Sequence, residues 1–224
     1  DLRRIACESL AHDGASAATE ALIERTRDPL PEVRCAALLA LARANPTGGE
    51  ATLTGALDDP FSDVRATAAV ALGLAGLSSA LGPLAERVSS DEAGLAAAAA
   101  EALGSLGPEA LELLRAQLDT DRAEVKLAAV RGLALQDGGL PDLVRLLNDP
   151  VAAVRRAAAE GMSTPDEAAT AALISTSAED TDPDVRAACV SALTRAERTP
   201  TVERAITAGL GDRAPQVLRA VLEA

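Results

Sequence analysis

Apolar residues recur along the whole chain with a spacing of about 31 residues. The clearest set consists of aliphatic residues 29 to 32 positions apart: Leu2, Val33, Val64, Leu95, Val125, Val154, Val185 and Val217. Four residues after most of these anchors stands a small residue, such as Ala37, and eight residues after stands a larger one, such as Leu41. Offsets of 0, 4 and 8 lie on one face of an α-helix. Each repeat is therefore predicted to contain a helix with a narrow apolar stripe.

A second apolar pattern precedes each anchor. Eleven residues upstream stand large aliphatic residues: Leu22, Leu53, Leu84, Leu114, Leu143, Ile174 and Ile206. Helix-breaking pairs such as Gly107-Pro108 and Thr199-Pro200 separate the repeats. Each repeat is thus predicted to be a helical hairpin, with a first helix upstream and a second helix carrying the anchor. The prediction is an all-α, single repeat domain over residues 1–224, with about seven full repeats and a partial one.

The turn inside each hairpin has its own pattern. Five residues before the anchors stand small polar side chains: Asp28, Asp59, Ser90, Thr120, Asp149, Asp180 and Asp212. Residues of these types are preferred at helix N-caps. Proline follows directly at Pro29, Pro60 and Pro150, and proline is favoured at the first helical position. The second helices are therefore expected to begin at these prolines.

The turn and the second helix together carry a family resemblance. Blocks such as Asp28-Pro29…Val33-Arg34 and Asp149-Pro150…Val154-Arg155 resemble the HEAT repeat. The period near 30 is similar to the short bacterial subtype, the phycobilisome-lyase HEAT-like repeat. This resemblance implies a right-handed α-solenoid, a superhelix of stacked antiparallel hairpins with the second helices on its concave side.

The resemblance also implies a ladder of hydrogen bonds between repeats, which we call the Asp–Arg ladder. Its members would be the basic residue after each anchor and the turn aspartates: Arg34, Arg65, Lys126, Arg155 and Arg186, with Asp28, Asp59, Asp149, Asp180 and Asp212. Ala96 and Leu218 stand where two further basic residues would be. The ladder is expected to be interrupted there, with local flexibility near residues 92–94.

Composition and charge narrow the function. Apolar residues make up 48% of the chain, but there is one Phe and no Trp or Tyr, which suits close-packed helices of Ala and Leu. The net charge of −13 argues against nucleic-acid binding, which depends on Lys and Arg, and against an anionic membrane surface. The negative charge either keeps the protein soluble or attracts a basic partner. We expect no membrane association and a cytoplasmic location.

The chain offers few residues for chemistry. Its single histidine, His12, and three cysteines, Cys7, Cys35 and Cys189, cannot form a usual zinc site or disulfide framework. Cys7 and Cys189 are expected in the core, and Cys35 on a more exposed face. No catalytic residue, metal or cofactor is predicted, so we expect a protein that is not an enzyme. The alternative is a lyase-like or chromophore-handling subunit, resembling HEAT-like bilin lyases. The chain starts at Asp1 without an initiator Met, and we expect it to be part of a longer chain.

One surface of the second helices has an unexpected composition. Residues at offsets 2 and 6 from the anchor point away from the apolar stripe, and in the central repeats they are Cys35, Leu39, Ala66, Val70, Ala97, Glu101, Leu127 and Arg131. We call Cys35, Leu39, Ala66, Val70 and Ala97 the apolar strip, bordered by Glu101 and Arg131. Either it binds a partner or curvature buries it against neighbouring helices. The predicted function is a scaffold that binds a protein or peptide, whose identity and oligomeric state stay open.

Overall fold

The computed structural model describes residues 2–11, 16–44 and 46–224. Over these residues it has fifteen α-helices and three short 3-10 helices and no strand, which confirms the all-α prediction. The second helices of the hairpins carry odd numbers: α1 (Leu2–Leu10), α3 (Pro31–Ala44), α5 (Ser62–Ala75), α7 (Ala93–Ser105), α9 (Ala123–Leu133), α11 (Ala152–Gly161), α13 (Pro183–Leu193) and α15 (Pro215–Leu222). The first helices carry even numbers: α2 (Ser16–Arg25), α4 (Pro46–Gly55), α6 (Leu81–Val88), α8 (Glu109–Ala116), α10 (Leu140–Leu146), α12 (Glu167–Glu179) and α14 (Pro200–Ala208). The 3-10 helices are η1 (Ala56–Asp58), η2 (Ser78–Ala80) and η3 (Gly209–Gly211).

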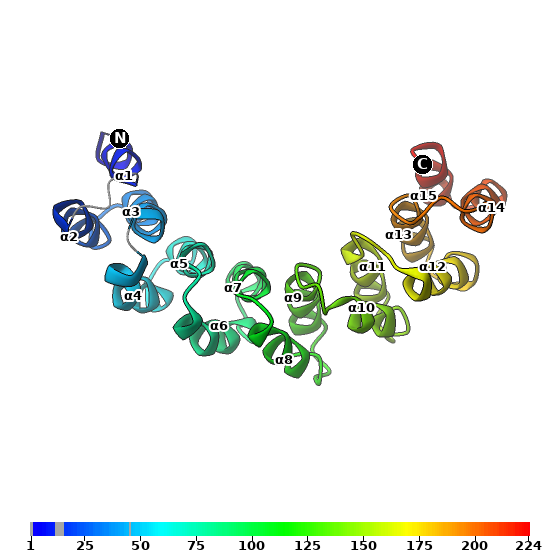
Figure 1. Cartoon of the computed structure of the whole chain (residues 1–224), viewed down its shortest axis with the longest axis horizontal. Helices are drawn as coiled ribbons and strands as arrows, with labels where there is room; N and C mark the ends of the chain where they lie inside the picture. The colour runs from blue at the N-terminus through cyan, green and yellow to red at the C-terminus, as the bar shows by residue number, and fades with distance from the viewer. Residues whose placement is uncertain (1, 12–15, 45) are drawn as a thin grey trace. The chain divides into compact units, whose positions relative to one another are not determined.

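The chain divides into two compact units, Asp1–Leu118 and Asp119–Ala224. In the first unit α3, α5 and α7 form one layer, and α2, α4, α6 and α8 form the other (Figure 1). The second unit repeats this arrangement, with α9, α11, α13 and α15 in one layer and α10, α12 and α14 in the other. Each unit is thus a stack of helical hairpins, as predicted for a helical solenoid. One continuous domain over residues 1–224 stays a prediction.

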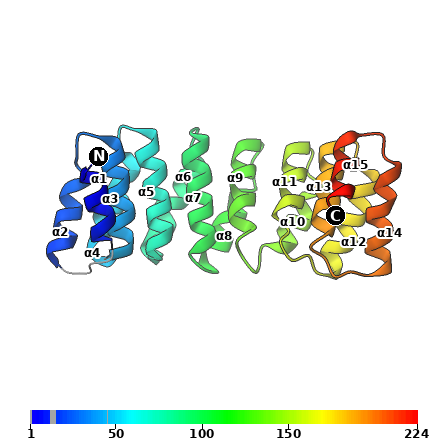
Figure 2. The same cartoon turned by 90° about the horizontal axis from the view of Figure 1, so that it is seen from above.

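The second helices of each unit pack closely because their middles are small. Ala37, Ala68 and Ala99 have no exposed surface, and α3, α5 and α7 lie side by side along their lengths (Figure 2). A Cβ added at Gly73 of α5 would lie 2.9 Å from both Cα and Cβ of Ala102 on α7. The small residues therefore determine how near one second helix comes to the next.

Larger residues fill the space between the two layers. At offset 8 the side chains of Leu41, Leu72, Leu103, Leu133, Met162 and Leu193 are completely buried. The first helices contribute Leu53, Leu84 and Leu114, which are equally buried. The predicted stripe is wrong at its first member, because Leu2 is 84% exposed. Helix α1 is exposed over most of its length, with Cys7 as its buried residue.

The polar turn residues do not cap the second helices as predicted. Helix α5 begins at Ser62 and not at Pro60, and the Oδ1 atom of Asp59 accepts the backbone N–H of Phe61 at 2.9 Å. This bond to the N–H two residues on is an Asx turn, a stable alternative to the helical cap. The same bond recurs in the other hairpins, from Leu30 to Asp28, Glu92 to Ser90, Arg122 to Thr120, Val151 to Asp149, Asp182 to Asp180 and Ala214 to Asp212. The residues Pro29, Pro60 and Pro150 therefore lie in the turn.

Candidate functional site

The Asp–Arg ladder joins the turn of each hairpin to the second helix before it. Arg155 donates from Nε and Nη2 to the two carboxylate oxygens of Asp180, at 2.7 and 2.9 Å. Its Nη1 also donates to the carbonyl oxygen of Asp149, at 2.9 Å. Such a two-pronged bond between guanidinium and carboxylate is strong and directional. Arg155 therefore ties its own turn to the next one, and Arg34, Arg65 and Arg186 donate in the same way to the carbonyl oxygens of Asp28, Asp59 and Asp180.

The other predicted members are brought together in the same way. Arg34 bonds Asp59 at 2.8 and 2.9 Å, Arg186 bonds Asp212 at 2.7 and 3.0 Å, and Lys126 reaches Asp149 at 2.7 Å. Buried polar groups with satisfied bonds of this kind stabilise a fold. The ladder groups are thus bonded to one another, and their structural role stays a prediction.

Two further members escaped the sequence analysis. Arg3, which follows the first anchor, donates to both oxygens of Asp28 at 3.0 and 3.2 Å. Arg65 pairs with Glu92 at 2.5 Å, because Ser90 occupies the usual aspartate position. The acidic partner of Arg65 stands two residues after the position of the aspartate in the other repeats. The spacing of the repeats alone could not identify it. At the following repeat the two ladder positions hold Ala96 and Thr120, which cannot form an Arg–Asp pair.

The ladder lowers the pKa values of three of its carboxyl groups, those of Asp59, Asp180 and Asp212. The hydrogen bonds from Arg186 and from the N–H of Ala214 lower the pKa of Asp212 to about 2. The hydrogen bonds from Arg155 likewise lower the pKa of Asp180. Burial pushes the pKa of Asp59 upward, but the bonds from Arg34 and the Phe61 N–H outweigh it, and the pKa of that carboxyl is lowered. These acids stay ionised, which suits a structural role and not proton transfer.

The apolar strip lies on the surface of the first unit that faces away from the first helices. We call this surface of α3, α5 and α7 the second-helix face. Val70 is 43% exposed, and Leu39, Cys35, Ala66 and Ala97 are half-buried. Curvature therefore covers the strip only in part: Val70 stays exposed, while Leu39 is half-buried.

The strip is extended by a residue that the sequence analysis did not select. Leu74 stands four residues after Val70 on the same side of α5 and is 53% exposed. It follows offset 6 by one helical turn, so continuing the same periodicity would have found it. Glu101 of α7 is exposed beside the strip. Leu127, half-buried, and Arg131, exposed, belong to α9 in the other unit.

The equivalent surface of the second unit carries polar residues on α11 and α13, but α9 has Leu127, which is half-buried, and is followed by Leu135, which is 57% exposed. Arg156 and Glu160 occupy the two positions on α11, with their charged groups 3.4 Å apart, and Ser191 is exposed on α13. On α1 the same positions hold the ion pair of Arg4 and Glu8. Exposed pairs at this spacing contribute little to stability and solvate a helix face. At offset 6, large apolar side chains therefore stand on α3 and α5 alone among the described second helices.

Side chains that could take part in catalysis or bind a metal are few and mostly buried. Burial raises the pKa of the Cys189 thiol to about 12 and also raises the pKa of Cys7. Cys35 is half-buried, with its Sγ 3.8 Å from the carbonyl oxygen of Asp63. His12 lies outside the described residues. Within the described part of the chain no three His, Cys, Asp or Glu residues are grouped as metal ligands, and none of its helices is long and apolar enough to cross a membrane.

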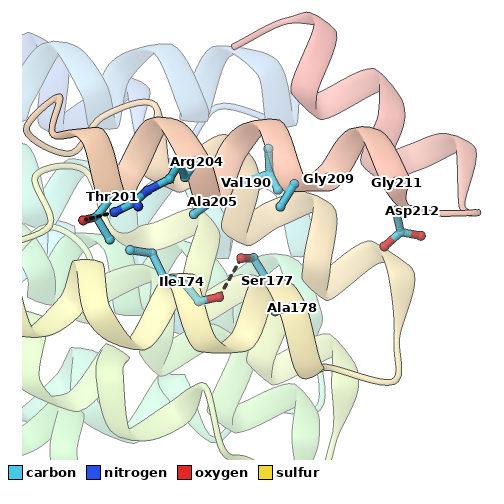
Figure 3. Close-up of a pocket in the computed structure, with 11 residues that line it drawn as sticks. Ile174, Ser177, Ala178, Val190, Thr201, Arg204, Ala205, Gly209, Gly211 and Asp212 are labelled. Atoms are coloured by element: carbon cyan, nitrogen blue, oxygen red, sulfur yellow. Dashed lines mark hydrogen bonds between the residues drawn. The ribbon is translucent and has the colours of Figure 1, made fainter.

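A cleft of about 600 Å³ opens between α12 and α14 in the second unit. Its walls carry Ile174 and Ala178 of α12, with Ala205 of α14 opposite (Figure 3). Ala178 stands at a repeat position where earlier hairpins have larger residues, such as Leu57 of η1 and Val88 of α6.

The polar groups around this cleft are already used by the protein. Arg204 donates to the carbonyl oxygen of Pro200 and to Thr201, at 3.1 and 3.4 Å. Ser177 donates to the carbonyl oxygen of Ile174 at 2.8 Å, and Asp212 holds Arg186. The cleft therefore offers apolar walls without converging polar groups of the kind that orient a small ligand.

Comparison with known proteins agrees with this repeat architecture. The sequence matches a model of HEAT repeats over residues 49–134 and 123–194. No curated protein matches the chain.

Among solved structures, the complex of CpcE and CpcF of phycocyanin lyase from Nostoc sp. PCC7120 is 21% identical to this chain. The alignment covers 91% of this chain and 92% of that chain, with a TM-score of 0.53. The YibA protein of Escherichia coli is 16% identical, over 90% of this chain and 79% of that chain, with a TM-score of 0.57. Human deoxyhypusine hydroxylase is 21% identical, over 97% and 86%, with a TM-score of 0.45. At such identities the likeness to the lyase complex and to YibA shows the fold alone. Together, the repeated hairpins and the family match over more than half of the sequence show that the chain belongs to the HEAT repeat family.

Proposed function

We propose that this chain is a scaffold that binds a protein or peptide partner on the second-helix face of the first unit. The observation that carries the proposal is the exposure of large apolar side chains there, 43% for Val70 and 53% for Leu74. Clustered exposed apolar residues are typical of interaction sites. Stacked repeats also present extended surfaces for partners. The proposal makes no use of catalysis, in keeping with the structural role of the ladder.

The experiment compares Val70→Glu with Ser191→Glu. Both residues stand at offset 6 of a second helix and both are exposed, so each glutamate is expected to change the free energy of unfolding by about 0.5 kcal/mol or less. The readout is capture of partners from an extract of the source organism, identified by mass spectrometry. Loss of one partner with Val70→Glu alone supports the proposal. Equal capture by both folded variants and the unchanged chain contradicts it.

A chromophore-handling role is the second candidate, because the phycocyanin lyase of Nostoc shares this fold and is a complex of two chains. The separating measurement is the visible absorbance of the purified chain after incubation with a bilin. A new absorbance band that survives gel filtration would favour the lyase-like role. A chain that stays colourless while it captures a protein favours the scaffold.

A further inference from the structure

Two acidic side chains flank the apolar strip on one side. Glu32 stands in the first turn of α3 and Asp63 in the first turn of α5, and both are exposed. Within the described part of the chain, neither carboxylate has a hydrogen-bond or ion-pair partner. An acid in the first turn favours the helix through its dipole, which accounts equally for Glu124 on α9 and Asp184 on α13. Seven residues after the acid, α3 and α5 have Leu39 and Val70, whereas α9 and α13 have Arg131 and Ser191.

The spacing of the acids and the apolar residues suits one kind of occupant. Glu32 precedes Leu39 by seven residues, and Asp63 precedes Val70 by seven, so the acidic and apolar rows are about 10 Å apart at a rise of 1.5 Å per residue. An α-helix with its side chains is about 10–12 Å wide. A helix lying across α3 and α5 can therefore cover the apolar row while one flank reaches the acidic row.

The distance between neighbouring second helices also matches the spacing of side chains along a bound helix. Packed neighbouring helices lie about 8–10 Å apart, so Leu39 and Val70 present two apolar contacts at about that separation. In a helix, residues seven apart lie on one face and are about 10 Å apart. Two apolar residues of the occupant at this spacing can meet Leu39 and Val70, and two others on the flank can meet Glu32 and Asp63.

The net charge of the first unit indicates which charge the bound helix carries on the flank that faces Glu32 and Asp63. Residues 1–118 contain nine Arg and seventeen Asp or Glu, and such an imbalance attracts cationic ligands. We infer that the second-helix face of the first unit binds an amphipathic α-helix of a partner protein, with apolar residues against Leu39, Val70 and Leu74 and basic residues against Glu32 and Asp63. This inference rests on the proposed function and adds the chemistry of the partner.

The test uses the full chain and three synthetic amphipathic helices of about 18 residues, five turns. All three have the same leucine stripe, and their polar positions are lysine, glutamine or glutamate. Affinity is measured by fluorescence anisotropy at about 0.05 and 0.15 M salt. The lysine peptide is expected to bind tightest and to weaken as salt screens its charges.

Two double variants provide the matched comparison. Glu32→Gln with Asp63→Asn is expected to weaken the lysine peptide about three- to tenfold, as for two exposed ion pairs. Glu124→Gln with Asp184→Asn removes the same charges from the same repeat positions in the second unit and is expected to leave the affinity unchanged. Val70→Ser is expected to weaken the lysine and glutamine peptides alike. Circular dichroism of every variant verifies that the helices are intact.

Several results overturn the inference. If both double variants weaken the lysine peptide equally, the attraction is spread over the acidic chain and the face is not selective. If the glutamine peptide binds as tightly as the lysine peptide and only Val70→Ser weakens it, the charge assignment fails while the proposed function stands. If none of the peptides binds, the inference fails, and the capture experiment with Val70→Glu decides the proposed function separately.

Discussion

At each repeat boundary with a complete ladder, one basic side chain is held by two turns. Arg155 donates to the carboxylate of Asp180 in the next turn and to the carbonyl oxygen of Asp149 in its own. Both acceptors lie at fixed places because an Asx turn holds each aspartate. Only 14% of the Arg155 side chain is exposed, so water cannot fully replace these bonds. These bonds of single side chains are therefore predicted to stabilise the order of the repeats.

Arg155 and its neighbour Arg156 form a natural pair for mutagenesis. Arg155→Ala should lower the free energy of unfolding by about 1–3 kcal/mol, since it leaves bonded groups without partners. Arg156→Ala removes an exposed pair with Glu160 and should change it by about 0.5 kcal/mol or less. Urea denaturation followed by circular dichroism measures both. Equal losses in the two variants would show that the ladder has no special structural role.

The ladder also predicts how stability depends on pH. The pKa of Asp212 is about 2 in the folded chain and about 3.9 in an unfolded one. A lowered folded pKa means that the stabilisation is present above pH 4 and is lost as the pH falls toward 2. Asp212→Asn should therefore be less stable than the unchanged chain at pH 7 and lose less stability between pH 4 and 2. Urea denaturation at several pH values measures this, and identical pH profiles would contradict it.

At the scale of the element, small residues allow the second helices to approach one another. Gly73 of α5 meets the backbone of α7 so closely that an added Cβ would be 2.9 Å from Ala102. Its neighbour in the chain, Leu72, is completely buried. A methyl group at residue 73 can be accommodated only if the two helices move apart, which disturbs the packing of both.

Two glycine substitutions test this close approach. Gly73→Ala should lower the free energy of unfolding by about 1–3 kcal/mol through overpacking. Gly94→Ala in the first turn of α7, where nothing lies within 4 Å of the added Cβ, should raise it by up to about 1 kcal/mol, because alanine is the better helix former. Thermal denaturation of both variants gives the comparison. Stabilisation by both substitutions would show that α5 and α7 separate easily.

At the scale of the whole molecule, a solenoid is held by contacts between neighbouring repeats. Each of the two units has its own stacked second helices and its own buried leucines, such as Leu72 in the first and Leu193 in the second. Damage to one unit is then expected to spread over adjacent repeats and fade beyond them. A globular protein with one core would instead lose stability everywhere.

Native-state hydrogen exchange can detect this local response. Leu72→Ala removes a fully buried side chain, at a cost of about 2–5 kcal/mol, and should speed amide exchange in α3, α5 and α7 while α13 and α15 stay protected. Leu193→Ala should have the reverse effect. Uniformly faster exchange in all helices of either variant would indicate a single cooperative unit.

Much of the fold could be predicted from the sequence, because a helical repeat depends on local rules. The 31-residue period, the apolar offsets on each helix and the turn residues such as Asp59 and Asp149 depend on residues near one another in the chain. They predicted the hairpins and all but two of the ladder members described above. They also placed Leu39 and Val70 on the outer side of their helices, since the direction of a side chain follows from helical geometry.

Only the tertiary structure decided the features that depend on residues from different repeats. Glu92 replaces the missing aspartate as the partner of Arg65, which requires the two turns to be placed in space. The cleft beside Ala178 appears only when α12 and α14 are packed, and the exposure of Val70 and Leu74 depends on how the neighbouring helices cover them. Helical periodicity fixes the direction of a side chain on its own helix. The distance to the next helix comes from packing, which no single repeat contains.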